Sequence, residues 1–203
     1  MKITALTRTS PERITVCFDD GTELKSTLSV VTELRLRVGE ELDEVAYEEL
    51  SDASSLSLCK AHALRLINMR AMSRREMIRK LTEKGETPEN AEACADRLCE
   101  LGLIDDSSYA CAVVRHYSAK GYGASRIRQE LAARGIDREL ALEVLSEMPE
   151  QDEFLERFLR SRLTDPSDKA QVKKVSDALF RRGYSWDQIR HALYIFNSQE
   201  DHT

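Results

Sequence analysis

The sequence predicts a mainly α-helical protein made of tandem three-helix repeats in an elongated array, with a small N-terminal β-containing module. Three observations predict this fold class: a motif that occurs three times, apolar residues at helical intervals around each copy, and a first quarter of the chain with a strand-like pattern instead. Similarity at a nearly fixed period is typical of repeat architectures, in which each unit packs mainly on its neighbours. Such proteins usually act by presenting a long surface.

The first quarter of the chain has a strand-like pattern. Residues 13–18 alternate between polar and apolar and are rich in β-branched side chains, and an Asp-Asp-Gly turn follows them. Residues 22–28 are the expected return strand, and residues 3–9 are a candidate third strand. Residues 43–50 resemble a short acidic helix. We therefore expect an N-terminal β-hairpin plus short helix module over residues 1–53.

The repeated motif is Leu-x-x-(Lys/Arg)-Gly, and its glycines are Gly85, Gly135 and Gly183, which lie 50 and 48 residues apart. The cation before each glycine complements the negative end of a helix dipole, and glycine readily takes the left-handed conformation that ends a helix. Two residues later, a Thr, Asp or Ser can cap the next helix. The three glycines are therefore predicted to be structural turn residues between paired helices.

Apolar residues after each turn recur at helical spacing, as in Ala91, Cys94, Ala95 and Leu98, which predicts one buried face per closing helix. A further helix is expected before each pair. The predicted three-helix repeats are residues 54–104, 105–149 and 150–197, and residues 198–203 are expected to form a disordered tail.

Composition points to a soluble cytoplasmic protein. The net charge of −6 resides in residues 1–53, because residues 54–203 carry equal numbers of acidic and basic side chains. No apolar run approaches the roughly 18 residues that a membrane-spanning helix needs. The five cysteines are odd in number and form no CxxC pair, so we expect them to be core residues in a reducing compartment.

The motifs of common enzyme classes are missing from the sequence. It has no phosphate-binding loop, dinucleotide fingerprint, GxSxG elbow or HExxH motif, and its four histidines lack ligand spacing. We interpret Asp105-Asp106 as a helix N-cap rather than a metal-binding pair, and residues 120–123 as a flexible connection rather than a phosphate site. We therefore expect no catalytic residue, no cofactor and no metal.

Basic residues cluster before the glycine in all three copies of the motif. A charge run on one helix is usually only a solvated face, but its recurrence favours a shared basic stripe that suits a polyanion or an acidic protein groove. The candidate partner-binding residues are Arg75, Arg79, Arg126, Arg128, Arg134, Lys173 and Arg181.

Three segments carry a family resemblance. Residues 102–110, Gly-Leu-Ile-Asp-Asp-Ser-Ser-Tyr-Ala, resemble the GLIDDxxFA signature of the RecX regulatory proteins. Residues 120–136 are similar to that family's KGxxxIxxELxxKGI stretch, and residues 73–85 to its SxxELxxKLxxKG segment. The resemblance covers residues 55–197 and is weakest in the third repeat. Met77 stands where the family usually has leucine, a substitution that preserves volume.

The resemblance implies a modulator of the RecA recombinase. RecX-like proteins lie in the groove of the RecA–single-stranded DNA filament and inhibit its ATP hydrolysis, strand exchange and co-protease activity. The implied partner is the RecA filament, with single-stranded DNA contacted indirectly or weakly and no membrane; a monomer is expected. A sequence pI of about 5.4 is low for a protein that depends on DNA phosphates.

Two other functions fit the helical pattern. A helix-turn-helix DNA-binding regulator is the first, because each glycine turn joins two helices of suitable length. A general protein-interaction scaffold of the tetratricopeptide kind is the second, although the longer period and three-helix unit argue against it.

Overall fold

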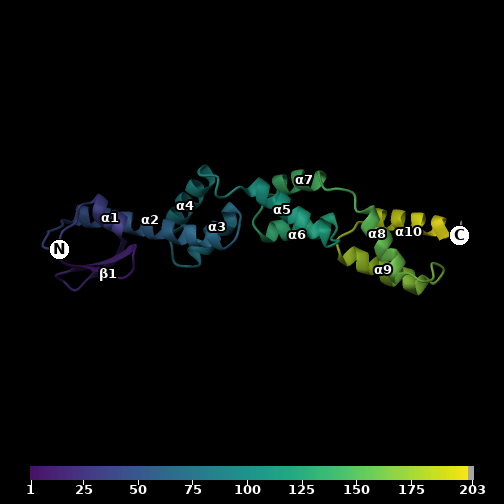
Figure 1. Ribbon diagram of the computed structural model, residues 1–203, viewed down its shortest axis with the longest axis horizontal. Coiled ribbons are helices and arrows are strands. Elements are labelled where there is room, and N and C mark those ends of the chain that lie inside the picture. The colour runs from purple at the N-terminus through teal and green to yellow at the C-terminus, as the bar shows by residue number, and fades with distance from the viewer. Residues whose placement is uncertain (201–203) are drawn as a thin grey trace. The chain divides into compact units, whose positions relative to one another are not determined.

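The computed structural model describes residues 1–200, with side chains described through Ser198, and the chain forms two compact units that divide after Ile104. Within the described residues it contains three β-strands and ten α-helices (Figure 1). The first unit holds the strands and helices α1 to α4, and the second unit holds helices α5 to α10.

The predicted strands form an antiparallel sheet of order β1-β2-β3, with β1 at Ile3–Arg8, β2 at Arg13–Phe18 and β3 at Glu23–Thr27. Every second side chain of β2 is buried, as the alternating pattern predicted. A short helix that the sequence pattern did not predict, α1 (Leu28–Glu33), follows β3 directly. Its N-terminus is capped by Thr27, whose hydroxyl accepts a hydrogen bond from the Val30 amide.

Helix α2 (Glu44–Met69) is one continuous helix where the sequence pattern suggested two. Residues 44–69 contain neither glycine nor proline, so nothing in the segment breaks the helix. Leu50, near its start, is buried in the core of the sheet, while Cys59 and Ala63 are buried in the core of the first repeat. The expected boundary between residues 53 and 54 therefore falls inside a helix that serves two cores.

The remaining helices follow the predicted order of three-helix repeats. The first repeat consists of the second half of α2 with α3 (Arg74–Thr82) and α4 (Pro88–Glu100). The other two repeats are formed by α5 (Asp106–Ala119), α6 (Ala124–Ala133) and α7 (Arg138–Ser146), then by α8 (Asp152–Arg162), α9 (Lys169–Arg181) and α10 (Trp186–Glu200). The mainly α-helical class with tandem three-helix repeats and an N-terminal sheet is thus confirmed.

Each repeat has its own apolar core. The leucine four positions before each glycine is fully buried, and the predicted faces of the closing helices point inward. In the part of α2 that faces the first repeat core, the buried side chains are Cys59 and Ala63; Leu64, which its spacing from Leu58, Ala61 and Ile67 predicts to lie on the inner face, is 45% exposed. Apolar residues recur along this helix with only weak helical periodicity, so the sequence pattern assigned the wrong leucine to its buried face.

The turns between paired helices have the expected geometry. Gly85, Gly135 and Gly183 have φ angles of +91°, +78° and +94°, in the left-handed region. Ser185 and Gln188 form a reciprocal capping box: the Gln188 amide donates to Ser185 Oγ at 3.2 Å, and the Ser185 amide donates to Gln188 Oε1 at 3.0 Å.

The segment at residues 120–123 is a packing contact and not the flexible connection that its glycines suggested. In the second unit the Gly123 amide donates to the Arg182 carbonyl at 2.9 Å, and the Ser125 amide donates to the Gly183 carbonyl at 3.1 Å. A Cβ atom on Gly123 would lie 2.5 Å from the carbonyl carbon of Gly183. Glycine is therefore required because the backbones of the second and third repeats touch here.

Arg182 closes this contact from the side of the third repeat. Its guanidinium donates to the carbonyls of Lys120 at 3.2 Å and Gly121 at 3.3 Å. It also lies within 5.6 Å of the ring centroids of Tyr122 and Phe154, so it links aromatic side chains of both repeats. We call this contact between residues 120–125 and residues 182–184 the glycine seam.

The expected tail begins inside a helix, because α10 continues through Glu200. The rest of that tail, residues 201–203, lies outside the described residues. In the described part of the chain, no helix is long and apolar enough to cross a bilayer.

Candidate partner-binding surface

The seven candidate cations lie on the second helix of each repeat or directly after it. Helix α3 carries Arg75 and Arg79, α6 carries Arg126 and Arg128 and is followed by its C-cap Arg134, and α9 carries Lys173 and Arg181. The buried faces of these helices are mainly apolar, and most of these cations project from the opposite, exposed face.

Four of the seven side chains are exposed and unpaired. Within the described residues, no carboxylate lies within 4.0 Å of Arg75, Arg128, Lys173 or Arg181. A cation without an internal partner can meet an anion of a binding partner without first breaking a native ion pair. These four residues are therefore the strongest candidates for contact.

Arg79 and Arg126 are exposed but have internal partners. Arg79 lies 3.7 Å from both Glu76 and Glu83, distances too long for hydrogen bonds, and its side chain is 59% exposed. Arg126 donates to Glu130 Oε1 at 3.0 Å. Glu76 also pairs with Arg70, and Glu130 with Arg134, so the exposed guanidiniums of Arg79 and Arg126 can turn to another anion without leaving these two carboxylates unpaired.

Arg134 stabilises the second repeat, which argues against the partner-binding role that its position suggested. Its guanidinium donates to Glu130 Oε2 at 2.6 Å and to the Tyr117 hydroxyl at 3.1 Å, and it lies 5.4 Å from the centre of the Tyr117 ring. The Tyr117 hydroxyl in turn donates to Glu130 at 3.1 Å. This closed network joins α5 to α6, so Arg134 is a weaker contact candidate than the four exposed cations above.

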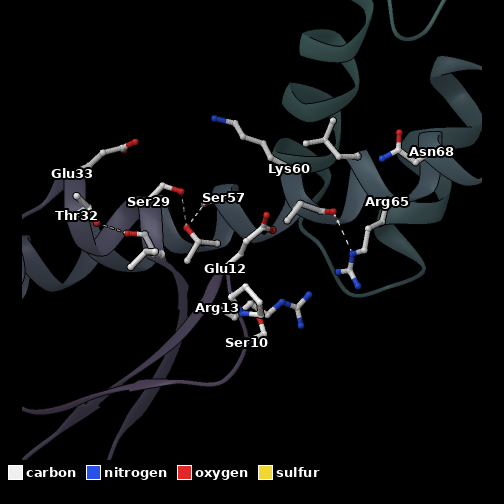
Figure 2. Close-up of a pocket in the computed structure, with 15 residues that line it drawn as sticks. Ser10, Glu12, Arg13, Ser29, Thr32, Glu33, Ser57, Lys60, Arg65 and Asn68 are labelled. Carbon is white, nitrogen blue, oxygen red and sulfur yellow. Dashed lines mark hydrogen bonds between the residues drawn. The ribbon is translucent and has the colours of Figure 1, made fainter.

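A separate groove of about 1140 Å³ lies in the first unit, between the β1–β2 turn and helices α1 and α2 (Figure 2). Lys60 and Arg65 line it from α2, Glu12 from the β1–β2 turn and Arg13 from the start of β2. Hydroxyl groups border its floor, where Thr27 is hydrogen-bonded to Ser57 at 2.7 Å. The groove is lined by charges of both signs, hydroxyl groups and the apolar side chains of Leu28 and Leu64, so it shows no preference for one sign of charge.

Three family models match the helical repeats. The models describe the first, second and third three-helix domains of RecX and match residues 59–98, 105–145 and 153–193, which together exceed half of the chain. The chain belongs to the RecX family of regulatory proteins. The resemblance seen in the sequence segments is thereby confirmed, including the third repeat, where it was weakest.

Relatives named Regulatory protein RecX share more than a third of their residues with this chain over 133 aligned residues. The relative from Xanthomonas axonopodis pv. citri (strain 306) is 38% identical over 64% of this chain and 82% of its own length. The relative from Stenotrophomonas maltophilia (strain R551-3) is 39% identical with the same coverage. RecX is a family of regulatory proteins and not of enzymes.

Solved RecX structures share the fold. A structure described as the crystal structure of regulatory protein RecX aligns with a TM-score of 0.69 at 24% identity, over 93% of this chain and 97% of the other. RecX from Lactobacillus salivarius aligns with a TM-score of 0.64 at 24% identity, over 71% of this chain and 98% of the other. At this identity the likeness concerns the fold alone.

Sequence reasoning missed two features of this RecX-family surface. The Arg126–Glu130–Arg134 spacing of four residues is readable as a helical ion-pair series, and it would have assigned Arg134 to an internal pair. Phe180 lies next to the buried Leu179 but off the apolar stripe, which marks it as an exposed aromatic side chain.

In the described part of the chain, no group of three or more His, Cys, Asp or Glu side chains lies close enough together to hold a metal ion.

We expect Glu130→Gln to lower the free energy of unfolding at about pH 7 by roughly 1 kcal/mol, because it weakens the pairs with Arg134 and Arg126. The hydrogen bond from Arg134 lowers the pKa of the Glu130 carboxyl, and Tyr117 and Arg126 lower it further. With a folded pKa below the unfolded one, this stabilisation is present above the unfolded pKa and is lost as the pH falls through the folded pKa.

Urea unfolding between about pH 7 and about pH 3 tests this prediction, since that range spans the ordinary carboxyl pKa. The variant should lose less stability on acidification than the wild type. Equal losses in both proteins would contradict the role of Glu130.

Proposed function

We propose that this protein binds the RecA–single-stranded DNA filament along its groove and inhibits its ATPase, strand-exchange and co-protease activities. The observation that supports the proposal is the recurrence, on the second helix of each matched RecX repeat, of exposed cations that have no carboxylate partner among the described residues. Arg75 lies in the first repeat, Arg128 in the second, and Lys173 and Arg181 in the third.

Distributed contact is the physical basis of the proposal. A single exposed ion pair contributes at most about 1 kcal/mol, too little for stable binding. Contacts on covalently joined repeats reinforce one another, because the first contact raises the effective concentration of the next. Such binding needs repeated partner subunits, and a protein filament provides them.

Inhibition would follow from occupancy of the groove. A chain that lies there excludes a homologous duplex or a repressor substrate from the same space. It also contacts neighbouring recombinase subunits, and fixing their relative positions would oppose the rearrangements of the ATPase cycle. No catalytic group of the regulator is needed for either effect.

Titration of the purified full-length protein into preformed RecA filaments on single-stranded DNA tests the proposal, with ATP hydrolysis as the measurement. We expect suppression at well below one molecule per recombinase subunit, because one molecule spans several subunits. Unchanged hydrolysis at equimolar protein would refute the proposal.

A different result would favour the helix-turn-helix regulator. The protein would then bind a specific duplex sequence, and the logarithm of its binding constant would fall with the logarithm of the salt concentration at a slope of about −0.9 per phosphate contact.

A further inference from the structure

Two stacked aromatic side chains remain open to solvent on the third repeat. Phe180 lies in the last turn of α9 and Trp186 is the first residue of α10. The turn at Gly183 brings their rings to a centroid distance of 5.1 Å, with 21° between the ring planes. Phe180 is 50% exposed and Trp186 is 47% exposed. Their neighbours Leu179 and Tyr184 fill the core, so this stack is apolar surface that the fold leaves uncovered.

A row of cations leads to this stack. Helix α9 carries Lys169, Lys173, Lys174 and Arg181 on its exposed surface, and within the described residues none has a carboxylate within 4.0 Å. The only acidic residue of the helix is the half-buried Asp177. Lys173 precedes Phe180 by seven residues, or two helical turns, so both side chains lie on the same face about 10 Å apart along the axis.

We propose that Phe180 and Trp186 form a stacking platform for the bases of single-stranded nucleic acid, with the cations of α9 contacting its phosphates. Flat aromatic rings beside a cationic track are the combination that binds single strands without sequence preference. An apolar protein segment would have to desolvate the bordering cations, and an acidic peptide would leave the rings unused. Duplex DNA is disfavoured because its bases are already stacked on each other.

This inference rests on the proposed function for its setting, because the filament holds the single-stranded DNA that the platform would reach. The platform itself can be tested without recombinase. Trp186 is the only tryptophan of the chain, so its fluorescence reports directly on the proposed site.

The experiment adds an oligothymidylate to the full-length protein at low salt and follows Trp186 emission. A parallel titration uses an abasic oligonucleotide of equal length, which keeps the phosphates but has no bases. We expect quenching by oligothymidylate and an affinity for it about tenfold higher than for the abasic strand, the effect typical of stacking on one aromatic side chain. Equal affinities for the two strands, or no binding, would overturn the inference.

Substitutions separate stacking from charge. Phe180→Leu and Trp186→Leu should each weaken binding of labelled oligothymidylate about tenfold, and leave binding of the abasic strand unchanged. The matched control is Tyr194→Leu, an aromatic side chain on α10 that is 72% exposed and should bind like the wild type. Equal losses for Tyr194→Leu and Trp186→Leu would contradict a specific platform. Because both platform rings are half exposed, circular dichroism should show unchanged folding.

The two proposals fail in different ways. If the protein suppresses filament ATP hydrolysis but oligothymidylate neither binds nor quenches Trp186, the platform is wrong and the proposed function stands. If oligothymidylate binds with the expected stacking signature but filaments are unaffected, the platform stands and the proposed function is wrong. Quenching of Trp186 by recombinase alone, without any response to oligothymidylate, would assign the stack to a protein partner and overturn the inference.

Discussion

Gly183→Ala is expected to lower the free energy of unfolding of the second unit by about 3 kcal/mol. Gly183 has a φ of +94°, and the left-handed conformation is roughly 1–2 kcal/mol less favourable for alanine than for glycine. The added Cβ atom would also lie 2.4 Å from the backbone nitrogen of Arg126. Relieving such a clash requires a backbone shift in α6, and overpacking of this kind typically costs about 1–3 kcal/mol.

Gly85→Ala is the matched control. Gly85 has almost the same φ, +91°, but a Cβ atom added there would have no other atom within 4 Å, so only the backbone strain remains. Gly123→Ala provides the complementary case, because its φ is ordinary while its Cβ would lie 2.5 Å from the Gly183 carbonyl. Urea unfolding followed by circular dichroism should rank Gly183→Ala as the most destabilising of the three. If Gly183→Ala and Gly85→Ala were equally mild, the glycine seam would not be a close backbone contact.

The features that the sequence predicted correctly are local. The cap at Ser185 depends on atoms within four residues, and the left-handed turn at Gly183 depends on the motif itself, so both can be read from short segments. The alternation at residues 13–18 likewise follows from one local rule, that successive side chains of a strand point to opposite faces of the sheet. Local chemistry thus determined the secondary structure of most of the chain.

The features that the sequence did not predict depend on distant partners. Gly123 has the same local signature as a flexible linker, and only the backbone of Gly183, 60 residues later, explains why a side chain is excluded. Similarly, α2 continues through residues 50–55 because the sheet and the first repeat both bury part of it. The hydrogen bond of Ser54 to Ser26 across 28 residues gives no sequence signal.

The candidate surface was predicted only in part for the same reason. The seven cations could be located on the correct helices from the repeat, but their pairing depends on neighbouring helices. Arg134 reaches Tyr117 on α5, which a view of α6 alone does not show. Arg128 has no such partner within the described residues and remains exposed.

Reversing two unpaired cations of the second unit, in the double variant Arg128→Glu and Lys173→Glu, is expected to raise the concentration needed for half-maximal filament inhibition by about tenfold or more. Both side chains are exposed and unpaired within the described residues, so their loss breaks no native ion pair and the fold should persist. The new carboxylates would face the anionic surface that the lysine and arginine are proposed to contact, and like charges brought together across an interface are strongly unfavourable.

The matched control is Lys25→Glu with Arg37→Glu, which changes the net charge equally on exposed residues of the N-terminal module. If inhibition depended on net charge alone, both double variants would weaken it to the same extent, which would contradict a local contact. If the contact is local, only the Arg128→Glu and Lys173→Glu variant loses inhibition. Raising the salt concentration should then reduce the difference in half-maximal inhibitory concentration between the two double variants, because salt screens exposed charges.

Arg134→Gln should instead lower stability and leave inhibition by the folded protein unchanged, since the Arg134 guanidinium already binds Glu130 and Tyr117.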